Sequence, residues 1–267
     1  MTDIEAKLWE IGELFPADLI SKLQRDSERI AYHVRLATRG LNPPAAVCDI
    51  GGGFGMFSLG CAAQGFTSVM VDNFQASEGA RYRNEILGIH RRYGVRVETR
   101  NVVADGVDFP PESFDTITCF DSMEHWHHSP KGVFRQIVAG LKPGGVFILG
   151  VPNGVDLWKR ITVPLGRAKW SAMQDYYEQE VFTGHVREPD VGDLRYIARD
   201  LGLVDVTIFG RNWSPFHRSG PRIVRMAARA GDRCMRLLPS LCLNIYLRGR
   251  KLPQDALLQA RGTCRGA

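Results

Sequence analysis

Features that define several other classes of protein are missing from this sequence of 267 residues. No run of apolar residues reaches the ~18 needed to cross a bilayer. The first ten residues carry three acids, so they do not form the basic and then apolar start of a secretory signal peptide. The six cysteines form no C-x-x-C pair and have no regular spacing, which disfavours a disulfide or zinc framework. They are expected to be reduced packing residues in a cytoplasmic protein.

The composition is that of an ordinary globular chain, with 44% hydrophobic and 24% charged residues. This excludes a wholly disordered or collagen-like protein and allows one α/β domain with extra helices. The charge is unevenly distributed. Residues from 211 onward carry twelve Lys and Arg against two acids, whereas residues 1–210 have a net charge of −5. A basic C-terminal segment on a mildly acidic body can meet phosphates, anionic lipid or an acidic protein.

Hydrophobic patterning predicts alternating strands and helices. Residues 4–39 show apolar positions at helical spacing and end at Asn42-Pro43-Pro44. Strand-like apolar runs follow at 45–50, 68–72, 95–103, 114–120 and 146–151, with helical segments at 76–91 and 131–140. This alternation predicts βαβ units, and therefore a doubly wound, mostly parallel sheet with helices on both faces.

The remaining segments are less regular. Residues 153–185 are expected to be irregular, followed by a helix at 190–201, a strand at 204–210, a basic helical stretch at 221–238 and a last strand at 244–248. We therefore expect a single domain, with a helical cap (1–44), a core (45–210), a basic helical insertion (211–243), a last strand (244–251) and a tail (252–267).

A glycine-rich loop lies between the first predicted strand and the next helix. It reads Asp49-Ile50-Gly51-Gly52-Gly53-Phe54-Gly55, a context in which glycines let the backbone approach a nucleotide-like ligand. The dinucleotide pattern G-x-G-x-x-G fails, because Met56 stands where the third glycine should be. No G-K-[ST] follows, so a loop that cradles nucleoside triphosphates is also excluded.

The spacing D-x-G-x-G-x-G resembles the cofactor loop of the class I S-adenosylmethionine (SAM) methyltransferases. Asp72 at the end of the second strand, Pro111 to Asp115, Leu141 to Gly145 and Val151-Pro152-Asn153 resemble further motifs of that family. The resemblance covers residues 45–155 in unbroken order and continues weakly to 210. It implies a Rossmann-like sheet of seven strands, a methyl-transfer activity and SAM as cofactor.

The resemblance also assigns cofactor-binding residues. Asp72 would accept hydrogen bonds from both ribose hydroxyls, which suits the two oxygens of a carboxylate. The family places an acidic residue after strand three, near the adenine; Asp105 is the candidate here, although a gapless register back from Asp115 places Val103 there. The full expected set is Asp49, which orders the loop and the methionine end of SAM, with Gly51, Gly53, Gly55, Asp72, Asp105 and Phe120.

A cluster of polar residues follows the fourth strand, at the sheet edge where α/β folds bind ligands. If the chain is helical there, Asp121, Glu124 and His125 share one face. With the later His185 they could hold a divalent cation, either Mg²⁺ or Mn²⁺ through the oxygens or Zn²⁺ through the imidazoles. The alternatives are that His125 or His185 acts as a metal-free general base, or that the Glu-His pair is only structural.

This pattern resembles the acidic-x-x-Glu-His sequence, with a later His, of two methyltransferase branches. These are the ubiquinone-biosynthesis O-methyltransferases and the 2′-O-methyltransferases that act on the 3′ ends of small RNAs. In both, the resemblance implies a metal that holds the substrate hydroxyls, with Glu124, His125 and His185 at the catalytic centre here.

The predicted function is transfer of a methyl group from SAM to a hydroxyl of a small molecule or of a glycan- or lipid-linked acceptor. The basic segment 221–238 could lie on an anionic membrane, which would place a cytoplasmic protein peripherally on the inner membrane face. It could instead contact RNA or cover the substrate pocket; nucleic acid is the weaker option, because no RNA-binding signature is visible. The rival functions are an RNA 2′-O-methyltransferase and a catalytically silent SAM-fold module that binds a partner or a membrane.

Overall fold

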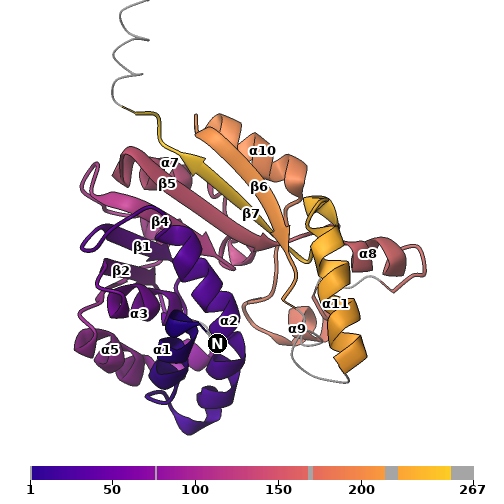
Figure 1. The fold of residues 1–267 in the computed structure, drawn as a ribbon, viewed down its shortest axis with the longest axis horizontal. Helices are drawn as coiled ribbons and strands as arrows, with labels where there is room; N and C mark the ends of the chain where they lie inside the picture. The colour runs from indigo at the N-terminus through magenta and orange to yellow at the C-terminus, as the bar shows by residue number, and fades with distance from the viewer. Residues whose placement is uncertain (1, 76, 168–170, 214–221, 254–267) are drawn as a thin grey trace, which may run out of the picture.

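The computed structural model describes residues 2–75, 77–167, 171–213 and 222–253, which contain a sheet of seven strands (Figure 1). The spatial order is β3-β2-β1-β4-β5-β7-β6, and only β7 runs antiparallel to its neighbours. The strands are β1 (Ala46–Ile50), β2 (Thr67–Asp72), β3 (Arg96–Thr99), β4 (Phe114–Phe120), β5 (Leu141–Pro152), β6 (Val204–Arg211) and β7 (Asn244–Arg250). The expected doubly wound, mostly parallel sheet of seven strands is confirmed.

Helices cover both faces of the sheet, because alternate residues of the buried strands point to opposite faces. Cys48 and Ile50 of β1 pack in one core, whereas Val47 packs in another on the opposite face. The first face carries α6 (Val102–Asp105), α7 (Lys131–Gly140) and α10 (Val191–Asp200), and the second carries α1 (Asp3–Gly12), α2 (Ala17–Ala37), α3 (Met56–Ala63) and α5 (Arg83–Arg92).

Several predicted boundaries were wrong. The single helix over residues 4–39 is two helices, because Pro16 has no backbone N–H to donate and stands at the start of α2. The helix at 76–91 is divided at Tyr82 into α4 (Ser77–Arg81) and α5. The strand at 95–103 ends at Thr99, since the Asn101 side chain accepts hydrogen bonds from the next turn and caps α6.

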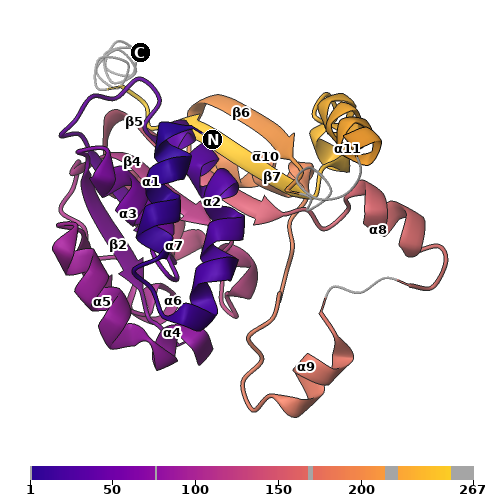
Figure 2. The ribbon, with the colours of Figure 1, turned by 60° about the horizontal axis from the view of Figure 1, so that its bottom comes forward.

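Three helices lie outside the layered body. The segment expected to be irregular, 153–185, contains α8 (Leu157–Thr162) and α9 (Met173–Glu178), and α11 (Arg222–Met235) lies between β6 and β7. All three lie to one side of the sheet, with α9 on a long excursion of the chain (Figure 2). In the described part of the chain no helix is long and apolar enough to cross a membrane, and the five described cysteines are free; Cys264 lies outside the described residues.

The carboxyl ends of the central parallel strands meet at one edge of the sheet. They are Ile50 of β1, Asp72 of β2, Phe120 of β4 and Pro152 of β5. The crevice at this edge is where open α/β sheets bind their ligands. The loops that follow these strands carry most of the predicted site residues.

Candidate active site

The glycine loop runs from the end of β1 to the start of α3. Gly51, Gly53 and Gly55 all have left-handed φ values, +73°, +57° and +73°. A side chain at Gly51 or Gly55 would collide with Ser122 or His90, whereas a Cβ at Gly53 would meet nothing within 4 Å. Gly53 is therefore the loop glycine that faces open space, which suits backbone contact with a ligand.

Asp72 lies beside this loop at the end of β2. Its Oδ2 accepts a hydrogen bond from the Gly53 backbone N–H (2.8 Å), and its Oδ1 accepts one from the Phe74 N–H (2.6 Å). Burial raises the pKa of Asp72, although these two hydrogen bonds oppose the rise. The carboxylate oxygens are thus held next to the open face of Gly53, an arrangement that fits a ligand with a vicinal diol such as the ribose of SAM.

Asp49 lies beneath the loop in β1 and is only 4% exposed. Its Oδ1 accepts a hydrogen bond from the Thr118 hydroxyl of β4 (2.7 Å). Burial raises the pKa of Asp49 to about 7, against the opposing effect of that hydrogen bond. The carboxyl group is therefore partly protonated near neutral pH when nothing cationic lies beside it.

This pKa predicts how the Asp49→Asn variant should differ from the wild type. When folding raises the pKa of a carboxyl group, the folded protein becomes less stable as the pH rises from the unfolded pKa, near 4, to the folded pKa, near 7. Without SAM, the variant should thus gain stability over the wild type across this range, by up to about 4 kcal/mol above pH 7. Urea unfolding at pH 4.5 and pH 8 measures it. The exposed Asp108→Asn is the control, and a pH-independent difference would show that the burial argument is wrong.

Phe120 ends β4 and is 9% exposed. The His33 ring of α2 stacks on it with centroids 4.1 Å apart. Gly150 of β5 allows this packing, because a Cβ there would lie 2.7 Å from both the Phe120 and Tyr246 rings. Phe120 therefore has a fixed position at the sheet edge, and its part in a cofactor site stays a prediction.

The adenine-contact candidates lie on the short helix α6. Asp105 is its last residue and is exposed, whereas Val103 is half-buried and packs against the core. Both stay predictions, since either position on this single helical turn could border an adenine bound beside β3.

The expected helix that would place Asp121, Glu124 and His125 on one face is absent. The segment forms only a 3₁₀ turn, Met123–His125, and Asp121 has a φ of +47° that no α-helix contains. The Asp121 carboxylate pairs with Arg29 of α2 (2.5 Å). Asp121 is therefore not part of the group of possible metal ligands. The prediction of a site with four ligands was wrong in including this residue.

The other three predicted ligands do come together. One ligand atom each from Glu124, His125 and His185 lies within 4.8 Å of the others, and the two imidazole centroids are 4.8 Å apart. Two main-chain hydrogen bonds join the segments, since the backbone N–H groups of Val186 (2.7 Å) and Arg187 (3.3 Å) donate to the Glu124 carbonyl. The 3₁₀ turn after β4 is thus tied to residues 62 and 63 positions later.

Hydrogen bonds orient both imidazole rings. His125 Nδ1 lies 2.8 Å from the Thr183 carbonyl, and His185 Nδ1 lies 2.6 Å from the Glu188 carboxylate. Because both partners only accept, each Nδ1 carries the proton, which leaves Nε2 with a free lone pair in the neutral ring. A carbonyl or carboxylate at the second ring nitrogen is the usual companion of a metal-binding histidine.

Burial and neighbouring charges shift the pKa values of all three residues of the group. Burial, followed by the charge of Asp121, raises the pKa of Glu124 to about 8. Glu124 Oε2 is buried and has no hydrogen-bond partner among the described residues. Burial also lowers the pKa of His125, while the hydrogen bond to Glu188 raises that of His185. A cation beside Glu124 would compensate the buried carboxylate, so the residues fit a divalent metal.

Two residues that complete the site were missed at the sequence level. Glu188 is 4% exposed at its side chain and pairs with Lys159 as well as His185; an acid three residues after His185 was a usable signal. Although burial raises the pKa of Glu188, these two hydrogen bonds bring it below its usual range. Arg29 stands in the middle of α2, where no motif marks it.

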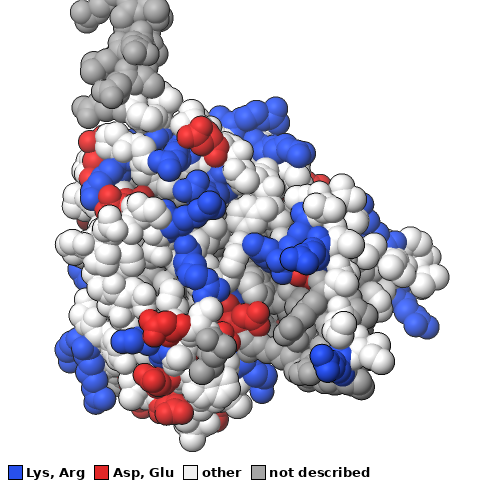
Figure 3. Space-filling view, viewed as in Figure 1, with Lys and Arg blue, Asp and Glu red and all other residues white. Residues whose placement is uncertain are grey.

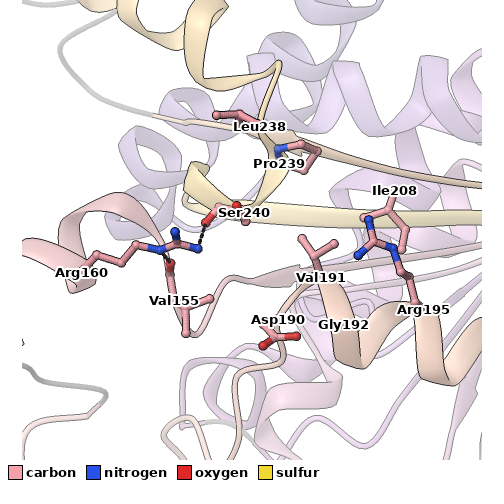
Figure 4. A pocket seen from close by; sticks show the side chains of 10 residues that line it. All are labelled: Val155, Arg160, Asp190, Val191, Gly192, Arg195, Ile208, Leu238, Pro239 and Ser240. Carbon is pink, nitrogen blue, oxygen red and sulfur yellow. Dashed lines mark hydrogen bonds between the residues drawn. The ribbon is translucent and has the colours of Figure 1, made fainter.

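Two cavities open near the carboxyl ends of β5 and β6. One of about 430 Å³ begins at the end of β5 and includes Lys159, the partner of Glu188; it is lined by Pro152, Asp156, Trp158, Lys159, Thr162, Arg167, Leu243 and Asn244. The other, of about 370 Å³, has Arg160 and Arg195 on two of its sides and contains none of the predicted site residues (Figure 4). Neither cavity is lined by a predicted site residue, and the first is linked to His185 only through the ion pairs of Lys159 with Glu188 and of Glu188 with His185.

Known proteins resemble this chain in sequence and in fold. A family model described as a methyltransferase domain matches residues 21–208. The ubiquinone biosynthesis O-methyltransferase of Pseudomonas putida strain F1 is 32% identical over 170 residues, which are 63% of this chain and 68% of the relative. That of Pseudomonas fluorescens strain SBW25 is 32% identical over 108 residues, 40% and 44% of the two chains.

Solved structures agree with the fold. A SAM-dependent methyltransferase from Archaeoglobus fulgidus superimposes with a TM-score of 0.55 at 16% identity, covering 86% of this chain and 94% of its own. The phosphoethanolamine N-methyltransferase 2 of Haemonchus contortus, in complex with SAM, gives 0.56 at 14% identity and covers 94% and 57%.

The fold, the glycine loop with its acidic partner and these relatives define a SAM-dependent methyltransferase. The chain belongs to the methyltransferase domain family, and its curated relatives are named O-methyltransferases.

Proposed function

We propose that the protein methylates a hydroxyl group of a small molecule, or of a glycan- or lipid-linked acceptor, with the help of a divalent cation on Glu124, His125 and His185. The observation that carries this proposal is the convergence of one carboxylate and two oriented imidazoles. SAM supplies the electrophilic sulfonium methyl. Methyl transfer needs no covalent intermediate with the protein. The chain therefore has to bind SAM and the acceptor, orient them, and take the proton from the acceptor hydroxyl.

The cofactor contacts follow from the loop geometry. The backbone of Gly51, Gly53 and Gly55 would border SAM, Asp72 would bind the ribose, and Asp49 would order the methionine end. Phe120 and Asp105 complete the proposed set. The support is that Gly53 faces open space with the Asp72 carboxylate hydrogen-bonded beside it.

The ligand set indicates which cations suit the site. With Asp121 paired to Arg29, the remaining donors are two nitrogens and one carboxylate. This set favours Zn²⁺ over Mg²⁺ and Mn²⁺, which prefer oxygen ligands. A bound cation lowers the pKa of an acceptor hydroxyl and holds it in place. If no metal binds, His125 is the better general base, because its lowered pKa keeps Nε2 unprotonated.

The test is transfer of a labelled methyl group from SAM to fractions of host small molecules, lipids, glycans and RNA. We expect label in the small-molecule, glycan or lipid fraction, and its loss with the His125→Ala variant. The exposed His127, two residues away, provides the matched control, since His127→Ala should retain activity. Label at RNA 2′-hydroxyls would favour the RNA enzyme instead. Binding of SAM without any transfer would identify a silent module.

A further inference from the structure

Helix α11 is fixed to the protein along one side. Its Asp232 is buried and accepts a hydrogen bond from the Asn212 side chain (2.9 Å), while Arg236 pairs with the same carboxylate. Asn212 in turn accepts a hydrogen bond from the Leu243 backbone N–H (2.7 Å). Asn212 directly follows β6 and Leu243 directly precedes β7, so this network ties α11 to the ends of both strands. The side of α11 that carries Asp232 therefore faces the protein.

The opposite side of α11 is apolar and exposed. Ile223 lies about 180° around the helix axis from Asp232, since successive residues turn by about 100°. Its side chain is 80% exposed, and that of Met226, on the same side, is 63% exposed. Leu237 (81%) and Leu238 (59%) extend the exposed apolar surface just past the helix. Ile223, Met226 and Leu237 line neither of the two cavities, whereas Leu238 also lines the cavity of about 370 Å³, so the alternative that this segment covers a substrate pocket stays untested.

The charge on this surface has one sign. Asp232 is the only acid in residues 211–251, and it is buried and paired, so it contributes no negative charge to the surface. Arg222 and Arg233 are exposed. Lys and Arg side chains lie near both ends of α11 in the space-filling view (Figure 3). An exposed apolar stripe bordered by arginines, with no exposed acid, matches an anionic and apolar partner.

We propose that α11, together with Leu237 and Leu238, binds the surface of an anionic lipid bilayer. The four apolar side chains would enter the boundary between headgroups and acyl chains, and the arginines would lie at the lipid phosphates. Nucleic acid offers phosphates but no apolar layer for Ile223 and Met226. None of these residues belongs to the group formed by Glu124, His125 and His185, so a failure of this proposal would leave the proposed methyl transfer intact.

The experiment is flotation of the full chain with phosphatidylcholine vesicles, with and without phosphatidylglycerol. We expect binding to the anionic vesicles only, which weakens as salt rises. The double variant Ile223→Ser/Met226→Ser should lower partitioning at least about tenfold, because it removes two apolar anchors from the membrane. Both side chains are exposed, so the fold should be unaffected.

The matched control is Tyr196→Ser on α10, which removes a side chain of similar exposure (64%) outside this surface and should change nothing. Arg222→Glu/Arg233→Glu should abolish the preference for anionic lipid. The proposal is overturned if neutral and anionic vesicles bind alike, if neither binds, or if the Ile223/Met226 variant binds as the wild type does. Salt-sensitive binding of RNA but not of vesicles would assign the surface to nucleic acid.

Discussion

Replacing His125 with alanine is expected to lower the affinity for Zn²⁺ by at least about 100-fold while leaving SAM affinity within a factor of about three. The reason is geometric. His125 offers an Nε2 lone pair to the group formed with Glu124 and His185, and its Nδ1 is held by the Thr183 carbonyl. Calorimetry with the metal alone measures the effect without requiring the methyl acceptor.

Two further variants sharpen this test. His127→Ala removes an exposed imidazole that only reaches the Phe182 carbonyl, and should leave Zn²⁺ affinity unchanged. Asp121→Asn should lower it far less than His125→Ala does, because that carboxylate pairs with Arg29 and acts on Glu124 only through its charge. If the wild type binds no divalent ion, or if His127→Ala weakens binding as much as His125→Ala, the three-residue site is wrong.

The second large effect is expected at the glycine loop. Gly53→Val should weaken SAM binding at least about 100-fold, because a β-branched residue is strained at a φ of +57° and its side chain would fill the open space beside Asp72. Calorimetric titration with SAM and with S-adenosylhomocysteine measures it, and circular dichroism establishes that the variant is folded.

Gly202→Val is the control for backbone strain. Gly202 also has a left-handed φ, +62°, and open space around its Cβ, but it lies in the turn after α10. The two variants should lose similar stability, whereas only Gly53→Val should lose the cofactor. Retention of SAM affinity by Gly53→Val would remove the loop from the cofactor site.

The parts of the site that could be predicted are those encoded by neighbouring residues. The loop from Asp49 to Gly55 follows a buried strand, and Asp72 ends the next one, so parallel pairing alone brings them to one edge of the sheet. The order of strands and helices was predictable for the same reason. Segments with the hydrophobic period of a strand alternate with segments with that of a helix, and this alternation specifies βαβ units.

What could not be predicted depends on distant contacts or unusual backbone conformations. Asp121 was assigned to a helix face, but its left-handed φ breaks the spacing on which that assignment depended. Its partner Arg29 lies 92 residues earlier, in a helix whose own pattern is simply amphipathic. The basic helical stretch was expected to run to residue 238, whereas α11 ends at Met235 and the exposed Leu237 and Leu238 follow it.

Glu124 has two tasks that use different atoms of one residue. Its main-chain carbonyl receives the N–H groups of Val186 and Arg187, while its side chain belongs to the proposed metal site. The two tasks are therefore thermodynamically linked. If a bound ion favours the observed conformation of residues 182–187 by some factor, that conformation must raise the affinity for the ion by the same factor. Substitutions in this loop could thus alter metal affinity without touching a ligand, and the ion would set how firmly the whole excursion through α9 is anchored.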